Sequence, residues 1–473
     1  MAQKYALLVF FSFSFLTFSC YGQELRIKKG VVVDSLEVND SINQTISLYL
    51  PRKFELSGKW PLLMVFNMQG QAKQEVSKYV TVADSLGYVV AASNAIHDSV
   101  TLTKNVLRTK RMLDRISSLL PIHKSRVYTA GIEAGGRFAN LVPVFIKDIE
   151  GTISFNAALT NAELLTAKNP FHFIGVIQRN NHSYLPLLQS EKVLNNLRFQ
   201  NNLLVYDGDT PVGQKELYKA LSYFDLLAMA RENIPKDTVR IETLYRRDLR
   251  EIQELQEQKK FVLANRAMAE TLFTFRTLKD TDSLRSAKRE LKRSKAFRDI
   301  NRAQGTAFFN EGLLREDFAY FLEEDVLTYN FNNLGWWNYQ MGRINKYIND
   351  SSAVQQQLGH RLKGYINALI ADNIQVVVSQ KVVDEEALVL LYMLKTLTAS
   401  EDFENYLQVV SLAAKNEDFG TALFYLEEAL KKGFKDKDRL YAIKHTALLR
   451  ITPEFNTLVA KYLDESRYKI KDE

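Results

Sequence analysis

Short apolar runs alternate with amphipathic stretches through the first half of the chain. Residues 45–50 alternate apolar and polar positions and end at Pro51, which is typical of a half-buried strand, whereas 61–66 (PLLMVF) is continuously apolar, as in a strand buried on both faces. Further strands are predicted at 88–92, 126–130, 152–156, 173–177 and 202–206, and helices at 76–86, at 102–120, from the turn after 130 to about 147, and at 215–231. Strands that alternate with helices predict an α/β domain with a mostly parallel sheet over 23–233.

The pattern changes at about residue 234. Strand-like runs nearly vanish, and long stretches with helical periodicity follow. The loop signals between these stretches lie around Asp280, Gly305, Asn349 and Ser400. We therefore predict an all-helical domain over 234–400 and a further helical region over 401–473.

The segment 406–434 predicts two helices joined by a short turn at 416–418. On the second helix, Ala422 and Ala429 lie seven residues apart with Leu426 between them, and such small residues let two helices pack closely. The arrangement resembles one tetratricopeptide repeat, although the tryptophan, glycine and proline positions of the strongest consensus are missing. A generic helical hairpin is the alternative, and either one must pack on neighbouring helices to bury its faces.

The segment Gly131-Ile132-Glu133-Ala134-Gly135-Gly136 follows the strand at 126–130 and opens a helix. It has the frame of a nucleophile elbow, G-x-S-x-G, with Glu133 in place of the serine. On this strand–turn–helix context, the region from about 45 to 233 resembles α/β-hydrolases of the small esterase type, related to polyhydroxybutyrate depolymerases and feruloyl esterases. The resemblance implies an α/β-hydrolase fold followed by the helical, tetratricopeptide-like region.

The resemblance also implies where a catalytic triad would lie, because serine, acid and histidine follow in that chain order. The acid is expected after the strand at 173–177, where the loop reads QRNNHS and holds no carboxylate. The histidine is expected after the strand at 202–206, where Asp209 stands, and the oxyanion loop at 67–70 (NMQG) keeps one glycine of the usual His-Gly-Gly. We therefore expect a degenerate triad and no catalytic residue. The expected ligand pocket consists of Met68, Gln69, Gly70, Glu133, Ala134 and Asp209.

A rearranged active site is the alternative hypothesis. Glu133 and Asp209 would form an acid/base pair, because two facing carboxylates raise the pKa of one of them, and His182 in the acid loop would serve as a base for ester hydrolysis. His97 and Asp98 are a second candidate pair, with an ordinary polar loop as the alternative. The six histidines and the single cysteine show no metal-ligand spacing, and the chain has no P-loop or dinucleotide fingerprint. We expect neither a metal nor a cofactor.

Composition narrows the class of protein. With 46% hydrophobic and 25% charged residues, the 473-residue chain is neither a disordered nor a membrane protein by composition. The net charge of +7 is modest for this length and does not predict nucleic-acid binding. We interpret the basic cluster at 285–302 as a solvated helix face rather than a nucleic-acid or membrane patch. We interpret Trp336 and Trp337 as core residues, with a peptide-binding groove as the alternative.

The N-terminus predicts export. Lys4 precedes an apolar run at 5–18 and then small residues, which is typical of a secretory signal peptide over 1–22, cleaved after Gly22. A loose lipobox that ends at Cys20 is the less favoured alternative, because Phe18 is bulky for that motif. No later run reaches the ~18 apolar residues of a transmembrane helix. We expect an exported protein in the periplasm or associated with the outer membrane.

Three hypotheses of function follow. The first is a non-catalytic α/β-hydrolase-like scaffold or binding module of the bacterial cell envelope, with a helical protein-interaction domain, protein partners in the envelope and a small acyl or glycan-derived ligand. The second is an esterase-type hydrolase that uses Glu133, Asp209 and His182. The third is a component of an envelope assembly in which the hydrolase-like domain is only structural.

Overall fold

The computed structural model describes residues 28–39, 42–166, 169–208 and 213–467. The chain divides into two compact units, Met1–Val127 and Tyr128–Glu473, and the division falls inside one strand, β5 (Ile122–Ile132). The signal peptide predicted at 1–22 lies outside the described residues, together with Cys20, and so does Asp209. The domain boundaries predicted at 233 and 400 stay predictions.

In the first unit, four strands are neighbours in the order β1-β2-β4-β3. The elements are β1 (Val32–Asn39), β2 (Ile42–Tyr49), β3 (Trp60–Phe66), α2 (Ala72–Leu86), β4 (Val89–Ser93) and α3 (Leu102–Leu119). β1 is antiparallel to β2 and β2 to β4, whereas β3 and β4 are parallel. The predicted apolar strand at 61–66 is buried at every position, as its sequence indicates.

The sequence pattern did not predict β1. Most of its described side chains are exposed or half-buried, and only Val38 is buried. Its pairing with β2 also shifts register between Val33 and Leu36 and again between Glu37 and Asn39. Such irregularities interrupt the period-two alternation by which a strand is recognised in a sequence.

In the second unit, β5, β6 (Gly151–Phe155), β7 (His172–Gln178) and β8 (Asn201–Tyr206) are neighbours in chain order, and every pair is parallel. Three helices follow these strands: α4 (Ala134–Phe145) after β5, α5 (Tyr184–Asn196) after β7 and α6 (Gln214–Ala230) after β8. Parallel strands require such crossover connections. The predicted α/β class with a mostly parallel sheet is confirmed.

Helix α5 was not predicted, because Pro186 interrupts its apolar positions in the sequence. In the structure Pro186 lies in the first turn of α5, where a helix has no use for the missing backbone N–H. Tyr184, Leu187 and Leu194 form the buried face of this helix.

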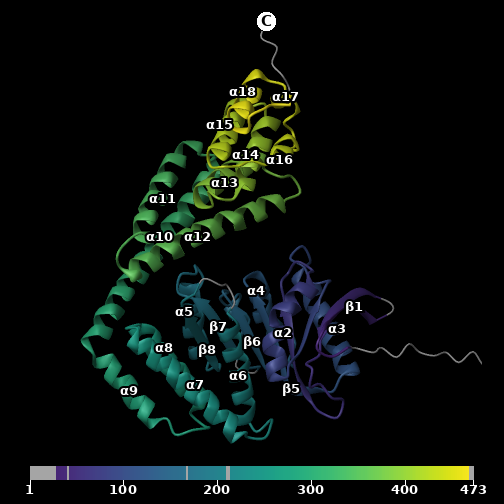
Figure 1. Cartoon of the computed structure of the whole chain (residues 1–473), viewed down its shortest axis with the longest axis vertical. Coiled ribbons are helices and arrows are strands. Elements are labelled where there is room, and N and C mark those ends of the chain that lie inside the picture. Colours follow the sequence, from purple (N-terminus) through teal and green to yellow (C-terminus); the bar gives the residue numbers. More distant parts are fainter. Residues whose placement is uncertain (1–27, 40–41, 167–168, 209–212, 468–473) are drawn as a thin grey trace, which may run out of the picture. The chain divides into compact units, whose positions relative to one another are not determined.

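After α6 the described chain has no further strand. The helices shown in Figure 1 are α7 (Thr238–Glu257), α8 (Phe261–Phe275), α9 (Asp282–Arg293), α10 (Lys295–Thr328), α11 (Leu334–Ile348), α12 (Ala353–Val378), α13 (Glu385–Thr398), α14 (Phe403–Lys415), α15 (Phe419–Lys431), α16 (Lys437–Tyr441), α17 (Ala447–Arg450) and α18 (Pro453–Leu463). Many of them begin at a residue whose side-chain oxygen accepts a backbone N–H of the first turn. These N-cap residues are Asp237, Ser294, Asp384, Asp402, Asp418, Asp436 and Thr452. The predicted all-helical second half is therefore confirmed.

One predicted loop signal was wrong. Gly305 lies inside α10, a continuous helix of 34 residues. A side chain at this position would meet no atom within 4 Å, so the glycine occupies open solvent rather than a bend or a close contact. A single exposed glycine costs a helix only about 1 kcal/mol, which the buried positions of α10 outweigh.

The basic cluster lies on an exposed helix face, and its interpretation as a solvated face rather than a nucleic-acid or membrane patch stays a prediction. Along α9 and the start of α10, Leu284, Leu291 and Phe297 are buried, while most of the lysine and arginine side chains between them are exposed. Leu284 and Leu291 lie seven residues apart on α9, which places them on one side of that helix.

Helices α10 to α13 pack around an apolar core. Trp337 is 2% exposed, packs against Phe318 and donates its indole N–H to a carboxylate oxygen of Asp325 at 2.7 Å. Trp336 is partly buried against the same core. The tryptophan pair therefore belongs to the interior, as predicted, and Asp325 supplies the polar partner that a buried indole needs.

Helices α14 and α15 form the predicted hairpin, with its turn at 416–418. Ala422, Leu426 and Ala429 of α15 are completely buried. Helix α15 also packs against α18, so the hairpin buries a second face on a neighbouring helix. Within the part of the chain that the structure describes, no helix is both long enough and apolar enough to cross a membrane.

Helix α8 is attached to the edge of the parallel strands by buried polar contacts. The amide of Asn202 on β8 donates to Glu270 of α8 at 2.7 Å and its oxygen lies 2.8 Å from the Nε2 of His172 on β7. Arg266 of α8 makes two bonds, of 2.9 and 2.5 Å, to the carboxylate of Glu191 on α5. Burial lowers the pKa of His172 to about 4, so this imidazole is neutral at pH 7.

The neutral, buried His172 predicts a loss of stability in mild acid. In the unfolded chain a histidine takes up a proton below pH ~6.5, whereas in the folded chain it does so only near pH 4. Protons therefore favour the unfolded state, and the free energy of unfolding should fall by about 3 kcal/mol between pH 6.5 and 4. Urea unfolding across this pH range should show a smaller fall in the free energy of unfolding for the His172→Gln variant than for the unchanged protein. His182 and His360, whose pKa values are also lowered, should account for part of the remaining slope. Equal slopes in the two proteins would contradict the prediction.

Candidate functional site

The backbone at Glu133 has the geometry of a nucleophile elbow. Its dihedral angles are φ 50° and ψ −112°, a conformation that L-residues rarely adopt. Its N–H donates to the carbonyl of Phe155 on β6 at 2.9 Å, and its carbonyl accepts from Arg137 in the first turn of α4 at 2.9 Å. The Glu133 side chain is exposed and makes no hydrogen bond or ion pair with another described residue. The turn between β5 and α4 is therefore strained in the way the motif requires.

Two of the elbow glycines are needed for this turn. A Cβ atom on Gly131 would lie 2.2 Å from the carbonyl carbon of Gly135, and a Cβ atom on Gly136 would lie 2.9 Å from the carbonyl oxygen of Gly131. Neither distance leaves room for a side chain, so the start of α4 can approach the end of β5 only with glycine at both positions.

The loop after β7, where the resemblance places the acid, carries Arg179 instead. Its guanidinium makes two bonds to the carboxylate of Asp207 after β8, from Nε at 2.7 Å and from Nη2 at 2.5 Å. Lys260, just before α8, adds its ammonium 3.5 Å from the same carboxylate. Burial alone would raise the pKa of Asp207, but the bonds and charge of Arg179 and the charge of Lys260 outweigh it and lower the pKa. The Asp207 carboxylate therefore stays ionised and does not carry a proton.

The same loop is held by a buried ion cluster of the helical region. Glu311 of α10 is fully buried and accepts from Arg315 of α10 at 2.6 Å and from Arg361 of α12 at 2.8 Å. Arg361 also donates to the carbonyl of Arg179 at 2.9 Å, and Arg315 to the carbonyl of His182 at 2.6 Å. The backbone of the would-be acid loop is thus the attachment point of α10 and α12.

His182 lies in this loop, half-buried against Gly364 of α12. Burial lowers its pKa, and the positive charges of Arg315 and Arg137 lower it further. Its ring makes no hydrogen bond with another described residue, so no carboxylate orients it as a triad would require. The structure does not pair His182 with Glu133 by any described contact.

The remaining predicted site residues lie in different parts of the chain. Met68, Gln69 and Gly70 belong to the first unit, where Met68 and Gly70 adopt positive φ angles and a Cβ on Gly70 would lie 2.8 Å from the carbonyl of Asn94. Glu133 and Ala134 belong to the second unit, and Asp209 lies outside the described residues. The predicted pocket of these six residues stays a prediction.

The second candidate pair does form. The Nδ1 atom of His97 lies 2.7 Å from a carboxylate oxygen of Asp98 and 2.9 Å from the hydroxyl of Ser99. Asp98 is exposed and the backbone N–H of Asp98 donates to the carbonyl of Met68. These contacts tie a surface loop together, which agrees with the polar-loop interpretation.

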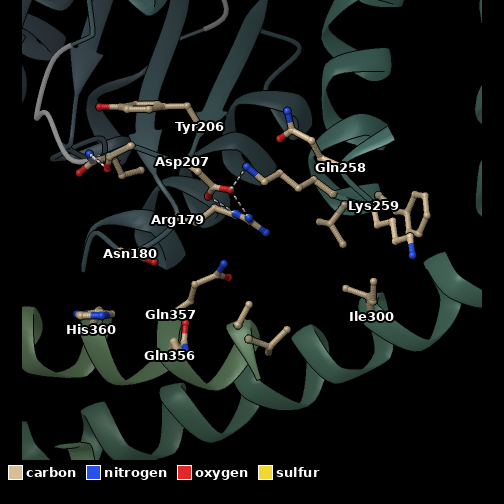
Figure 2. A pocket seen from close by; sticks show the side chains of 17 residues that line it. Arg179, Asn180, Tyr206, Asp207, Gln258, Lys259, Ile300, Gln356, Gln357 and His360 are labelled. Carbon is tan, nitrogen blue, oxygen red and sulfur yellow. Dashed lines mark hydrogen bonds and ion pairs between the residues drawn. The ribbon is translucent and has the colours of Figure 1, made fainter. Parts of the chain in front are cut away.

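A cavity of about 480 Å³ opens beside Arg179 and Asp207 (Figure 2). Its walls come from the ends of β7 and β8, from residues 258–260 between α7 and α8, from the first turn of α8, from Ile300 of α10 and from the first turns of α12. In Figure 2, Gln357 of α12 points toward Arg179 from the opposite wall. Sequence reasoning missed this cavity. Arg179 was visible in the loop, but its partners lie 28 residues away in Asp207 and 182 residues away in Arg361.

The described residues contain no group of three histidine, cysteine, aspartate or glutamate side chains that could hold a metal ion. The lining of the cavity combines lysine, arginine, amide and carboxylate groups with His360, Tyr206 and apolar side chains.

The strand order in each unit, the parallel run β5 to β8 and the strained turn between β5 and α4 make the fold α/β-hydrolase-like, and an all-helical region follows. No protein-family model matches the chain, and no curated protein matches it in sequence. Solved structures do resemble it. Est1E from Butyrivibrio proteoclasticus is 15% identical with a TM-score of 0.33, and the match covers 44% of this chain and 100% of that one.

Two further structures show the same degree of likeness. An acetyl ester-xyloside bifunctional hydrolase from Caldicellulosiruptor lactoaceticus is 15% identical with a TM-score of 0.34, over 43% of this chain and 98% of that one. The AtxE2 isopeptidase is 11% identical with a TM-score of 0.34, over 42% of this chain, and the match spans only 40% of the isopeptidase. Likeness at this level says nothing of the chemistry of this chain.

The crowding at the elbow predicts opposite effects for two glycine substitutions. Gly131→Ala should lower the free energy of unfolding by about 3 kcal/mol or more, because its Cβ overlaps the backbone of Gly135. Gly305→Ala, on the open surface of α10, should instead raise it by about 1 kcal/mol. Chemical unfolding of both variants and of the unchanged protein measures these differences in the free energy of unfolding. A Gly131→Ala variant as stable as the parent would show that the turn is not as tight as described.

The buried cluster predicts a large cost for removing one of its charges. Arg361→Met leaves Glu311 with one partner and the carbonyl of Arg179 with none, so the free energy of unfolding should fall by about 3–5 kcal/mol. Arg298→Met, on the exposed face of α10, is the matched control and should change it by less than ~0.5 kcal/mol. Urea unfolding distinguishes the two. A cost below ~1 kcal/mol for Arg361→Met would mean that the cluster does not hold the loop.

Proposed function

We propose that this protein is a non-catalytic α/β-hydrolase-like scaffold or binding module of the bacterial cell envelope. The observation that carries the proposal is the ion pair of Arg179 with Asp207. It occupies the two loops that would hold the acid and the histidine of a triad, and it commits the one carboxylate described there to two cations. A triad needs a neutral imidazole oriented by a free carboxylate, and this pairing supplies neither.

The elbow supports the same proposal. Glu133 offers no hydroxyl for nucleophilic attack, and its carboxylate stands one methylene further from the backbone than that of the aspartate nucleophiles found in some α/β-hydrolases. An ester formed on a carboxylate still needs a base to activate water against it. The described contacts give Glu133 no such partner, and the imidazole of His182 lies among arginine charges. We interpret the three positions together as a dismantled triad.

The helical region fits a protein-interaction role. Beside the hairpin of α14 and α15, a groove of about 630 Å³ is lined by apolar side chains of α13 and α15, among them Val389, Met393 and Phe424. Phe424 is 57% exposed and packs edge-on against Tyr425, with ring centroids 5.2 Å apart. We infer a tetratricopeptide-like surface for a protein partner, and from the N-terminal sequence we infer export to the periplasm or the outer membrane.

An ester-hydrolysis assay tests the proposal. The purified protein should turn over p-nitrophenyl acetate and methyl ferulate no faster than its Glu133→Gln and His182→Ala variants, because the described site lacks a nucleophile and an oriented base. Glu163→Gln changes an exposed carboxylate elsewhere and is the matched control. Turnover that Glu133→Gln abolishes and Glu163→Gln leaves unchanged, in folded proteins, would overturn the proposal in favour of a rearranged hydrolase.

A further inference from the structure

The cavity beside Arg179 and Asp207 has the size of a ligand site. Its volume of about 480 Å³ lies within the range of ~300–1,000 Å³ that is common for small-molecule pockets. It lies between the carboxyl ends of parallel strands and a layer of helices, which is where α/β folds bind their ligands. The elbow residue Glu133 does not line it.

The charge of the lining is positive. Arg179, Lys259 and Lys260 contribute three cations and Asp207 one anion, so the ionised groups sum to +2. His360 also lines the cavity, and burial followed by the charge of Lys363 lowers its pKa, so it adds no charge at pH 7. Arg179 uses two of its five N–H donors on Asp207, and the rest remain for another acceptor. The cavity therefore favours an anion.

Gln357 gives a second and independent indication. It is 8% exposed, it lines the cavity, and its amide makes no hydrogen bond with another described residue. Figure 2 shows it pointing toward Arg179 across the cavity. Because its amide faces the cavity and is not used by another described residue, it is available to a polar group that arrives from outside the chain.

The other polar side chains are mostly amides. Asn180, Gln258 and Gln356 line the cavity with Gln357, and each amide can both donate and accept a hydrogen bond. Hydroxyl groups have the same dual capacity, whereas an acyl chain has neither. The ring of Phe261 adds an apolar flank of the kind that packs against the face of a sugar ring.

We propose that this cavity binds a small saccharide that carries a carboxylate or a phosphate. Arg179, Lys259 and Lys260 hold the anionic group, while Gln357 and the neighbouring amides hold the hydroxyls. This inference deepens the proposed function, since it names the ligand class of the binding module and places the ligand away from the elbow residues.

Calorimetric titration of the full protein tests the ligand class. Glucuronate supplies a carboxylate, glucose 6-phosphate a phosphate, and glucose is the neutral control. At least one anionic sugar should bind, glucose should bind about tenfold more weakly or worse, and added salt should weaken only the anionic ligand. The tighter of the two anions identifies the group that the cavity prefers. Equal binding of glucose, or no binding of either anion at about 10 mM, would overturn the proposal.

Two variants locate the binding. Gln357→Leu keeps the volume of the side chain and removes its amide, and it should weaken the anionic sugar about tenfold, while Lys260→Met should weaken it several-fold. Gln375→Leu on the exposed face of α12 and Lys381→Met are the matched controls and should leave affinity unchanged. Unchanged affinity in Gln357→Leu would overturn the site. Binding and ester turnover are separate measurements. If the protein hydrolyses esters and also binds these sugars, the proposed function is wrong and the ligand site in the cavity is supported.

Discussion

The architecture of the second unit depends on one buried anion. Glu311 lies inside the helical region with no solvent exposure and forms ion pairs with Arg315 and Arg361. Arg315 also donates to the backbone carbonyl of His182, and Arg361 donates to that of Arg179. Taking a carboxylate and two guanidinium groups out of water is costly unless every one is paired. The tyrosine rings near the arginines help, since Arg315 lies 4.6 Å from the ring centre of Tyr365. Because both arginines also donate to carbonyls of the loop after β7, the cluster joins α10 and α12 to that loop.

This attachment occupies several groups of the loop after β7. Its carbonyls are bound by α12 and α10, its first side chain is bound by Asp207, and its histidine packs against α12. In a hydrolase the same edge of the sheet would have to leave a carboxylate free to orient an imidazole. In this protein the loops at that edge of the sheet contact the helical region and line a cationic cavity. The elbow keeps its strained backbone because strand and helix still meet there, whatever residue stands at the turn.

Much of the fold could be predicted from local pattern. Some elements can be recognised from a few neighbouring residues. They are the buried strand at 61–66, the glycine turn at 131–136 and the alanine spacing on α15. The misses have local causes as well. β1 has an irregular, exposed pattern, Pro186 conceals the start of α5, and Gly305 looks like a break but costs its long helix little. Of the candidate site, the sequence indicated the elbow and the absence of a carboxylate after β7, but not the residues that replace the triad's contacts.

By itself, the sequence determined the secondary structure class, the strained turn at Glu133 and the types of residue available at the ends of the strands, because these depend on steric contacts and periodicity between near neighbours in the chain. Only the tertiary structure decided what those residues do. Arg179 is an ordinary loop arginine until Asp207 and Arg361 reach it from 28 and 182 residues away. Gln357 is an ordinary helix residue until the fold turns its amide into the cavity. Charge pairing and burial act through space, so they could not be read from the order of the residues.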